Sequence, residues 1–183
     1  MIKFLSSFVL LLSAPVLCAA ADWQLTTEAN SGDTFYMDFS SIAPVGTYRK
    51  AWVQINHQNQ LETDGYPKKK YQTTRLLYYF DCQAKTLSTF QTVRYGEKFA
   101  GGEVVESKSF KFNSKDLEDV VPDTVGEAVM QTACTSNAER TKIKAKNAAE
   151  VAEIIKKLKA LEAVDSPAAR RAVKADTEST TEL

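Results

Sequence analysis

Residues 73–82 read Thr-Thr-Arg-Leu-Leu-Tyr-Tyr-Phe-Asp-Cys, and this stretch decides the fold class. In an extended chain, successive side chains point to opposite faces of the sheet. One face then carries Leu76, Tyr78, Phe80 and Cys82, and the other carries Leu77, Tyr79 and Asp81. Both faces are apolar, which is typical of a strand covered on both sides. The stretch therefore predicts a central strand.

Strand patterns on both sides of this stretch extend the sheet. Tyr48–His57 alternates clearly: one side carries Ala51, Val53 and Ile55, and the other carries Lys50, Trp52, Gln54 and Asn56. Trp52 on the polar side indicates that this side is partly covered or used for contact. Further strands are predicted at Trp23–Leu25, Thr34–Phe39, Thr86–Tyr95 and Glu103–Phe112. We expect an α+β fold with an antiparallel sheet of about five to six strands, flanked by short helices.

Helical patterns replace the strand patterns after Asn113. Asp116–Pro122 predicts a short helical turn, and Thr124–Ala133 predicts a helix of about two turns that leads into Cys134. Residues 136–164 predict a separate C-terminal helix, because they are rich in Ala, Lys and Glu and contain no Gly or Pro. Its apolar residues recur near helical spacing: Ile143, Val151, Ile154, Ile155, Leu158 and Leu161.

The apolar stripe from Val151 to Leu161 spans about two heptads, whereas a coiled coil is indicated by three or four. The helix is therefore expected to lie on its own domain or to project from it, and a homodimer seam is the alternative. Residues 165–183 have a Ser-Pro, Ala-Arg and Thr-Glu composition, which predicts a disordered tail.

The first 21 residues have the order of a secretory signal peptide. Lys3 is followed by the apolar run Phe4–Leu12, and the small residues Cys18-Ala19-Ala20-Ala21 precede Asp22. We expect cleavage that leaves Ala21 or Asp22 as the first residue, and a protein that is periplasmic, surface-exposed or secreted. Lipidation of Cys18 is the alternative, but Leu17 is large where a lipoprotein signal has a small residue.

Removal of the signal peptide leaves two cysteines, Cys82 and Cys134. An even pair in an oxidising compartment predicts a disulfide bond, and two buried free thiols are the alternative. The bond would stabilise the fold by about 3–5 kcal/mol on the chain-entropy estimate. Two distant cysteines and the single histidine, His57, form no metal-ligand cluster, so no metal is expected.

Charge and motif content exclude several classes of function. The full chain has 23 basic and 23 acidic residues, so the mature chain without Lys3 has a formal charge of −1 and no global field for nucleic acid or a membrane. No second apolar run could span a bilayer. His57, expected at the surface, supports no catalytic triad, and no phosphate-binding loop appears. We expect no cofactor and no enzymatic activity; a hydrolase with an unrecognised carboxylate pair is the alternative.

The candidate contact region is the loop Gln58–Lys70, a long hairpin connection between two strands. It contains three successive lysines between two tyrosines, with an arginine close behind: Tyr66, Lys68, Lys69, Lys70, Tyr71 and Arg75. Basic and aromatic residues together suit an acidic protein or a polyanion. Trp52 is added as a candidate contact. A solvated hairpin tip without function is the alternative.

The order of these segments resembles the surface-adhesin protein E family of Gram-negative bacteria. The matching pieces are an export signal, Trp23, Phe35-Tyr36-Met37-Asp38 with Ser40-Ser41-Ile42, Ala51-Trp52-Val53, Tyr71 before Arg75, Tyr79-Phe80-Asp81-Cys82, and Cys134. The resemblance covers residues 23–135, within a predicted domain at 22–135. The Phe-Asp-Cys strand with its distant second cysteine is the most specific piece.

The resemblance implies a small antiparallel sheet flanked by short helices and held by one disulfide. It also implies binding of host matrix and plasma proteins, such as vitronectin, laminin and plasminogen. The expected function is therefore that of an exported, non-enzymatic binding protein. The alternative is a periplasmic envelope protein, an assembly factor or inhibitor, which binds a bacterial partner through the C-terminal helix.

Overall fold

The computed structural model describes residues 20–164. The predicted disordered tail at 165–183 and nearly all of the predicted signal peptide at 1–21 lie outside the described residues. The predicted boundaries of the domain, the C-terminal helix and these two segments therefore stay predictions.

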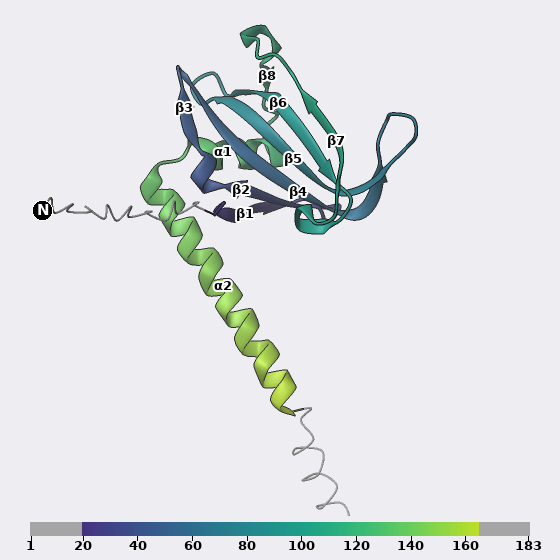
Figure 1. The fold of residues 1–183 in the computed structure, drawn as a ribbon. Helices are drawn as coiled ribbons and strands as arrows, with labels where there is room; N and C mark the ends of the chain where they lie inside the picture. The colour runs from purple at the N-terminus through teal and green to yellow at the C-terminus, as the bar shows by residue number, and fades with distance from the viewer. Residues whose placement is uncertain (1–19, 165–183) are drawn as a thin grey trace, which may run out of the picture.

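The described chain forms one antiparallel sheet and two α-helices, as Figure 1 shows. The main path of the sheet runs β1-β2-β4-β5-β6-β7, while β3 pairs with β4 and β8 pairs with β6. The strands are β1 (Trp23–Glu28), β2 (Thr34–Asp38), β3 (Ala43–Val45), β4 (Tyr48–Glu62), β5 (Lys70–Asp81), β6 (Thr86–Tyr95), β7 (Val104–Ser109) and β8 (Glu118–Asp119). The predicted α+β fold is confirmed.

Alternation along β4 and β5 places one apolar side against a helix. In the register of these strands, Ala51 pairs with Tyr78 and Val53 pairs with Leu76, so these residues share a face. Helix α1 (Val125–Cys134) covers that face. The buried core residues are Met37, Ala51, Val53, Phe80, Val129, Met130 and Ala133. The opposite face of the sheet lies outside this core.

Both ends of α1 are fixed. At its start, the Thr124 hydroxyl accepts a hydrogen bond from the Glu127 amide at 3.4 Å, which satisfies one of the free amides of the first turn. At its end, Arg49 Nη1 donates to the carbonyl oxygens of Ala133 and Thr135, each at 3.0 Å. The predicted disulfide between Cys82 and Cys134 is confirmed, with the two Cα atoms 5.6 Å apart.

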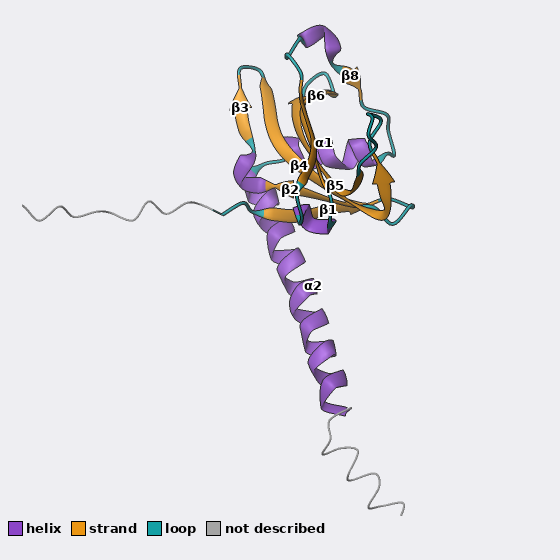
Figure 2. Ribbon diagram, turned by 45° about the vertical axis from the view of Figure 1, so that its right-hand side comes forward, coloured by secondary structure: helices purple, strands orange, loops and turns teal. Residues whose placement is uncertain are grey.

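Helix α2 (Asn137–Val164) follows at once and leaves the domain (Figures 1 and 2). It begins with a capping box, in which Ser136 Oγ accepts from the Glu139 amide at 3.3 Å and Glu139 Oε2 accepts from the Ser136 amide at 3.3 Å. Its first turns lie against β1, whereas residues 148–162 are all exposed. Neither helix of the described chain is long and apolar enough to cross a membrane.

Three local predictions were wrong. The connection between β4 and β5 is shorter than Gln58–Lys70, because β4 continues to Glu62 and β5 begins at Lys70. The strand predicted at Glu103–Phe112 covers Val104–Ser109. The turn predicted at Asp116–Pro122 is a 3-10 turn at Ser114–Asp116 followed by β8, because a short edge segment pairs with β6.

The expectation that His57 lies at the surface was also wrong. His57 is buried, and partners at both ring nitrogens compensate for the loss of water: Asp33 Oδ2 lies 3.2 Å from Nδ1 and Thr74 Oγ1 lies 2.9 Å from Nε2. Burial alone would raise the pKa of Asp33, but hydrogen bonds from the Gln58 amide and from His57 outweigh it and lower that pKa. This histidine therefore joins β4, β5 and the turn before β2.

Candidate functional site

The sheet face opposite α1 carries an arginine between two aromatic rings. In register, Arg75 of β5 pairs with Gln54 of β4 and with Val93 of β6, on the face that Trp52 also occupies. The guanidinium carbon of Arg75 lies 4.8 Å from the ring centre of Trp23 and 5.2 Å from that of Tyr95. Such stacking is a cation–π contact. Trp23, Trp52, Arg75 and Tyr95 are termed the aromatic–arginine cluster.

A buried glutamine fixes the direction of this guanidinium. Arg75 Nε donates to Gln54 Oε1 at 2.9 Å, and Gln54 Nε2 donates to Asn56 Oδ1 at 3.3 Å. Within residues 20–164, the two terminal nitrogens of Arg75 make no hydrogen bond. A planar guanidinium with both terminal nitrogens free can bind a carboxylate through two parallel hydrogen bonds. The terminal nitrogens of Arg75 are therefore free donors on the open face of the sheet.

The cluster lines a cavity of about 190 Å³, together with Ala21, Asp38 and Val93. Sites for small organic ligands usually have volumes of about 300–1,000 Å³. The smaller volume suits one side chain of a larger partner, such as a carboxylate that inserts beside Trp52.

The loop between β4 and β5 holds Tyr66, Lys68 and Lys69, with Lys70 at the start of β5, and projects from the end of the sheet (Figure 1). Its base is closed by two hydrogen bonds, from the Thr63 amide to the Lys69 carbonyl oxygen at 2.9 Å and from the Lys69 amide to Thr63 Oγ1 at 3.0 Å. Tyr66 is 100% exposed, and Lys68, Lys69 and Lys70 are exposed as well. We term Tyr66 and these three lysines the basic loop.

The charges of the basic loop are almost free of internal partners. Lys68 Nζ lies 3.5 Å from Glu62 Oε2, and both side chains are well exposed. Exposed pairs of this kind contribute about 0–1 kcal/mol, because water and salt screen them. The lysines therefore stay available to an acidic partner.

Tyr71 differs from the other residues predicted with it. Its side chain is buried, with the guanidinium of Arg94 4.7 Å from its ring centre and the ring of His57 at 5.6 Å. Tyr71 thus supports the base of the loop from within the fold. The structure divides the predicted contact residues into the exposed basic loop, the buried Tyr71, and Trp52 with Arg75 in the aromatic–arginine cluster.

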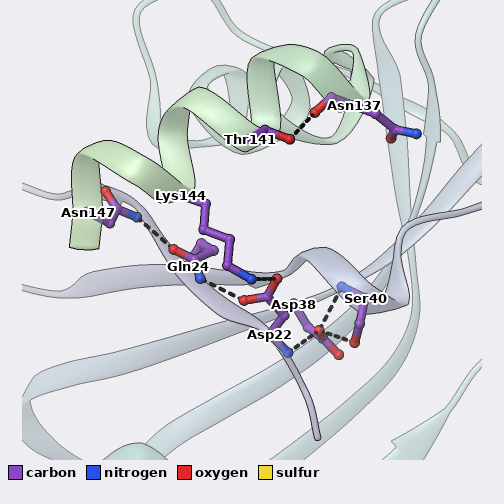
Figure 3. Close-up of polar contacts among 8 residues, drawn as sticks. All are labelled: Asp22, Gln24, Asp38, Ser40, Asn137, Thr141, Lys144 and Asn147. Carbon is purple, nitrogen blue, oxygen red and sulfur yellow. Dashed lines mark hydrogen bonds and ion pairs between the residues drawn. The ribbon is translucent and has the colours of Figure 1, made fainter. Parts of the chain in front are cut away.

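A polar junction attaches α2 to β1 beside the cluster (Figure 3). Lys144 Nζ lies 2.8 Å from Asp22 Oδ2, and this hydrogen bond is the main cause that lowers the pKa of Asp22. Asn147 Nδ2 donates to the Leu25 carbonyl oxygen at 3.1 Å and to Gln24 Oε1 at 3.3 Å. The junction fixes the first half of α2 and the start of β1 together.

Sequence reasoning missed Trp23 and Tyr95 as members of the site. Both were assigned only to strands, and the pairing of β1 and β6 with the other strands brings them to Arg75. No group of three or more His, Cys, Asp or Glu side chains that could hold a metal occurs among residues 20–164.

The fold is an antiparallel-sheet domain with one disulfide, and its open face carries the aromatic–arginine cluster. The model of the surface-adhesin protein E family matches residues 23–135, which is more than half of the chain. The chain therefore belongs to the surface-adhesin protein E family. No curated protein matches the chain.

Solved structures of Haemophilus influenzae protein E are similar to this chain. One crystal structure is 19% identical and has a TM-score of 0.49, with coverage of 75% of this chain and 95% of that chain. A second crystal form is 19% identical with a TM-score of 0.47, and covers 66% of this chain and 93% of that chain.

Proposed function

We propose that this protein is an exported, non-enzymatic adhesin that binds a host matrix or plasma protein. The observation that carries the proposal is the family match over residues 23–135, which spans the whole sheet, α1 and the disulfide. The predicted signal peptide supports export. The free guanidinium of Arg75 and the exposed lysines support binding of an acidic surface on the partner.

One partner can contact both parts of the proposed face. Lys70 and Arg75 lie five residues apart on β5, roughly 17 Å along a strand, and this odd spacing turns their side chains to opposite faces, so a partner reaches the basic loop at the end of the sheet. A standard protein–protein interface buries about 800 Å² on each side, which is wide enough for both. The basic loop supplies long-range attraction, and Arg75 supplies the directed hydrogen bonds.

Binding of the purified chain to immobilised vitronectin, laminin and plasminogen tests this proposal. Replacement of Lys68, Lys69 and Lys70 by Gln should weaken binding and reduce its dependence on salt, since exposed charges are screened within about 8 Å at physiological ionic strength. The matched control replaces Lys156, Lys157 and Lys159, three exposed lysines on α2, by Gln. The control removes the same charge at another place and should bind like the parent. Equal binding by the loop variant and the parent at low and high salt would contradict the role of the loop.

A second function is favoured by one specific observation on α2. The helix exposes five apolar residues on its projecting half, each between 46% and 67% exposed: Val151, Ile154, Ile155, Leu158 and Leu161. An exposed apolar stripe of this kind suits a partner helix. The alternative is therefore a periplasmic envelope protein that binds a bacterial partner through α2. Removal of residues 149–183 would abolish partner binding in this case and would spare adhesin binding by the sheet.

A further inference from the structure

Asp38 is a buried carboxylate without a cationic partner among the described residues. It lies at the end of β2 and its residue is 7% exposed. Its Oδ1 accepts hydrogen bonds from Ser40 Oγ at 2.6 Å, from the Ser40 amide at 3.0 Å and from the Asp22 amide at 2.8 Å (Figure 3). All three donors are neutral. A buried charge is unfavourable unless an opposite charge or several hydrogen bonds compensate it.

Asp22 is held at every polar group, although it precedes the first strand. Its amide nitrogen donates to Asp38, and its carbonyl oxygen accepts from the Phe39 amide at 2.9 Å. Its carboxylate accepts from Gln24 Nε2 at 2.7 Å and from Lys144 Nζ at 2.8 Å. Contacts from β1, α2 and the turn after β2 therefore place the Asp22 nitrogen against the Asp38 carboxylate.

We propose that the export peptidase cleaves between Ala21 and Asp22, and that the new α-ammonium of Asp22 forms a buried ion pair with Asp38. In this hydrolysis, one water molecule is consumed and the Ala21–Asp22 amide bond breaks. The carboxylate stays on Ala21, and the amine of Asp22 takes up a proton. An α-amino group has an ordinary pKa of about 7.7–8.0, so it is mostly charged at neutral pH.

The proposal chooses between the two cleavage points that the sequence leaves open. The small residues Ala19 and Ala21 lie three residues and one residue before the bond to Asp22, which is the Ala-x-Ala pattern of such sites. Cleavage one residue earlier would leave Ala21 as the first residue. The new α-ammonium would then belong to Ala21, which lines the same cavity, while the Asp22 nitrogen that hydrogen-bonds to Asp38 would stay a neutral amide.

Processing at this bond would also change the binding face. Ala21 lines the same cavity as Arg75 and Asp38, so its removal takes away one wall. The cavity would gain an ammonium beside the guanidinium of Arg75. Two cations around one buried carboxylate favour an acidic side chain as the occupant. The proposed cleavage thus adds an ammonium group to the cavity that the aromatic–arginine cluster lines.

The test compares two purified chains, one that begins at Asp22 and one that begins at Ala21. At a fixed urea concentration near the midpoint, the chain that begins at Asp22 should have a folded-to-unfolded ratio about tenfold higher, because an ion pair between an ammonium and a carboxylate replaces a hydrogen bond from an uncharged amide. The substitution Asp38→Asn in both chains should abolish the difference. Equal stability of the two parents, or a difference that persists after Asp38→Asn, would overturn the ion pair.

A second measurement covers the case in which Asp38→Asn does not fold. The pKa of the α-ammonium in the chain that begins at Asp22, measured by NMR, should be higher than about 7.7–8.0 if Asp38 dominates. The groups that oppose this rise are Arg75 in the same cavity and Lys144 on α2. An unshifted or lowered pKa would contradict the proposal.

The inference rests on the export part of the proposed function. Its tests distinguish a failure of the inference from a failure of adhesin binding. The N-terminal mass of the exported protein should correspond to a first residue of Asp22, and a first residue of Ala21 would overturn the cleavage point. The comparison of purified chains needs no export and no partner. A failure of adhesin binding would therefore leave the ion pair unaffected.

Discussion

At Arg75, a planar cation lies between the rings of Trp23 and Tyr95 while Gln54 holds its Nε. This arrangement removes much of the conformational freedom that an exposed arginine would lose on binding. Ordering one long side chain at an interface opposes association by about 0.5–1.5 kcal/mol. The fold thus preorganises an arginine whose planar guanidinium can form two parallel hydrogen bonds with a carboxylate.

Replacement of Arg75 by Lys tests this directed role. Lysine keeps the charge but lacks the planar fork, so partner affinity should fall about tenfold, which corresponds to the loss of one charge-assisted hydrogen bond. The dissociation constant measures the effect, and the salt dependence should stay near that of the parent. A variant that binds as tightly as the parent would show that Arg75 contributes charge alone or nothing.

Asp33 makes stability depend on pH. Its pKa is lower in the folded chain than its ordinary value, so its contribution is complete above about pH 4 and is lost as the pH falls through the folded pKa. Asp33→Asn should therefore be less stable than the parent at pH 7, and the gap should narrow as the pH falls below about 4. Urea midpoints of both chains from pH 7 to pH 3 measure this difference in stability. The control is Asp64→Asn on the exposed loop; a gap for Asp33→Asn that is constant with pH would contradict the linkage.

At the scale of single residues, alternation predicts which face a side chain occupies but not its neighbours on other strands. Trp52 and Arg75 were both chosen from the sequence, and they lie on one face because β4 and β5 pair in the register Gln54 with Arg75. Trp23 was assigned only to a strand, since the pairing of β1 depends on long-range contacts. His57 was misjudged because its partners Asp33 and Thr74 are far away in sequence.

The disulfide between Cys82 and Cys134 links the residue after β5 to the last residue of α1. Their separation of 52 residues restricts the unfolded chain strongly. The bond lies beside the core, where Phe80 packs with Ala133 and Met130. It therefore holds the only helix that covers the core face within the described residues.

Loss of this bond should destabilise the fold severely. Replacement of both cysteines by Ala should lower the free energy of unfolding by about 4 kcal/mol, mainly because the unfolded chain gains conformational freedom. Chemical denaturation of the parent and the double variant measures the loss. The parent under reducing conditions is the control and should resemble the variant. An unchanged urea midpoint would contradict a structural role for the disulfide.

Helix α2 has two halves with different roles. Residues up to Asn147 contact β1 through Lys144 and Asn147, whereas the rest is exposed. Truncation after Asn147 should change the free energy of unfolding by about 0.5 kcal/mol or less, because few contacts are lost. Truncation after Ser136 is the matched comparison and should destabilise more, since the junction with β1 disappears. Thermal unfolding of both chains measures this, and equal losses would contradict the division.

Among the elements, the long ones were predictable and the short ones were not. Residues 137–164 form a helix because no Gly or Pro interrupts them, and β4 and β5 alternate over many residues. The connection between β4 and β5 was drawn too long, because β4 continues past an irregularity to Leu61 and Glu62, which pair with Tyr71 and Lys70 of β5. Short strands such as β8 depend on a partner strand and have no pattern of their own.

At the scale of the whole molecule, the fold has three parts: a sheet face covered by α1, an open face with the basic loop, and the helix α2. One face of the sheet is closed by α1 and the disulfide and supplies stability. The other face and the basic loop are uncovered by helix α1, and α2 leaves the domain beside β1 (Figure 2). This division agrees with membership of the surface-adhesin protein E family, whose match ends at residue 135, before α2 begins.

The location of the protein tests the adhesin proposal most directly. Protease is added to intact cells and to cells with a permeabilised outer membrane, and the sheet domain is then detected with an antibody. A known periplasmic protein is the control for an intact outer membrane. We expect protease to remove the domain from intact cells while the control survives. A domain that survives on intact cells and is digested only after permeabilisation would contradict a surface adhesin and favour the periplasmic alternative.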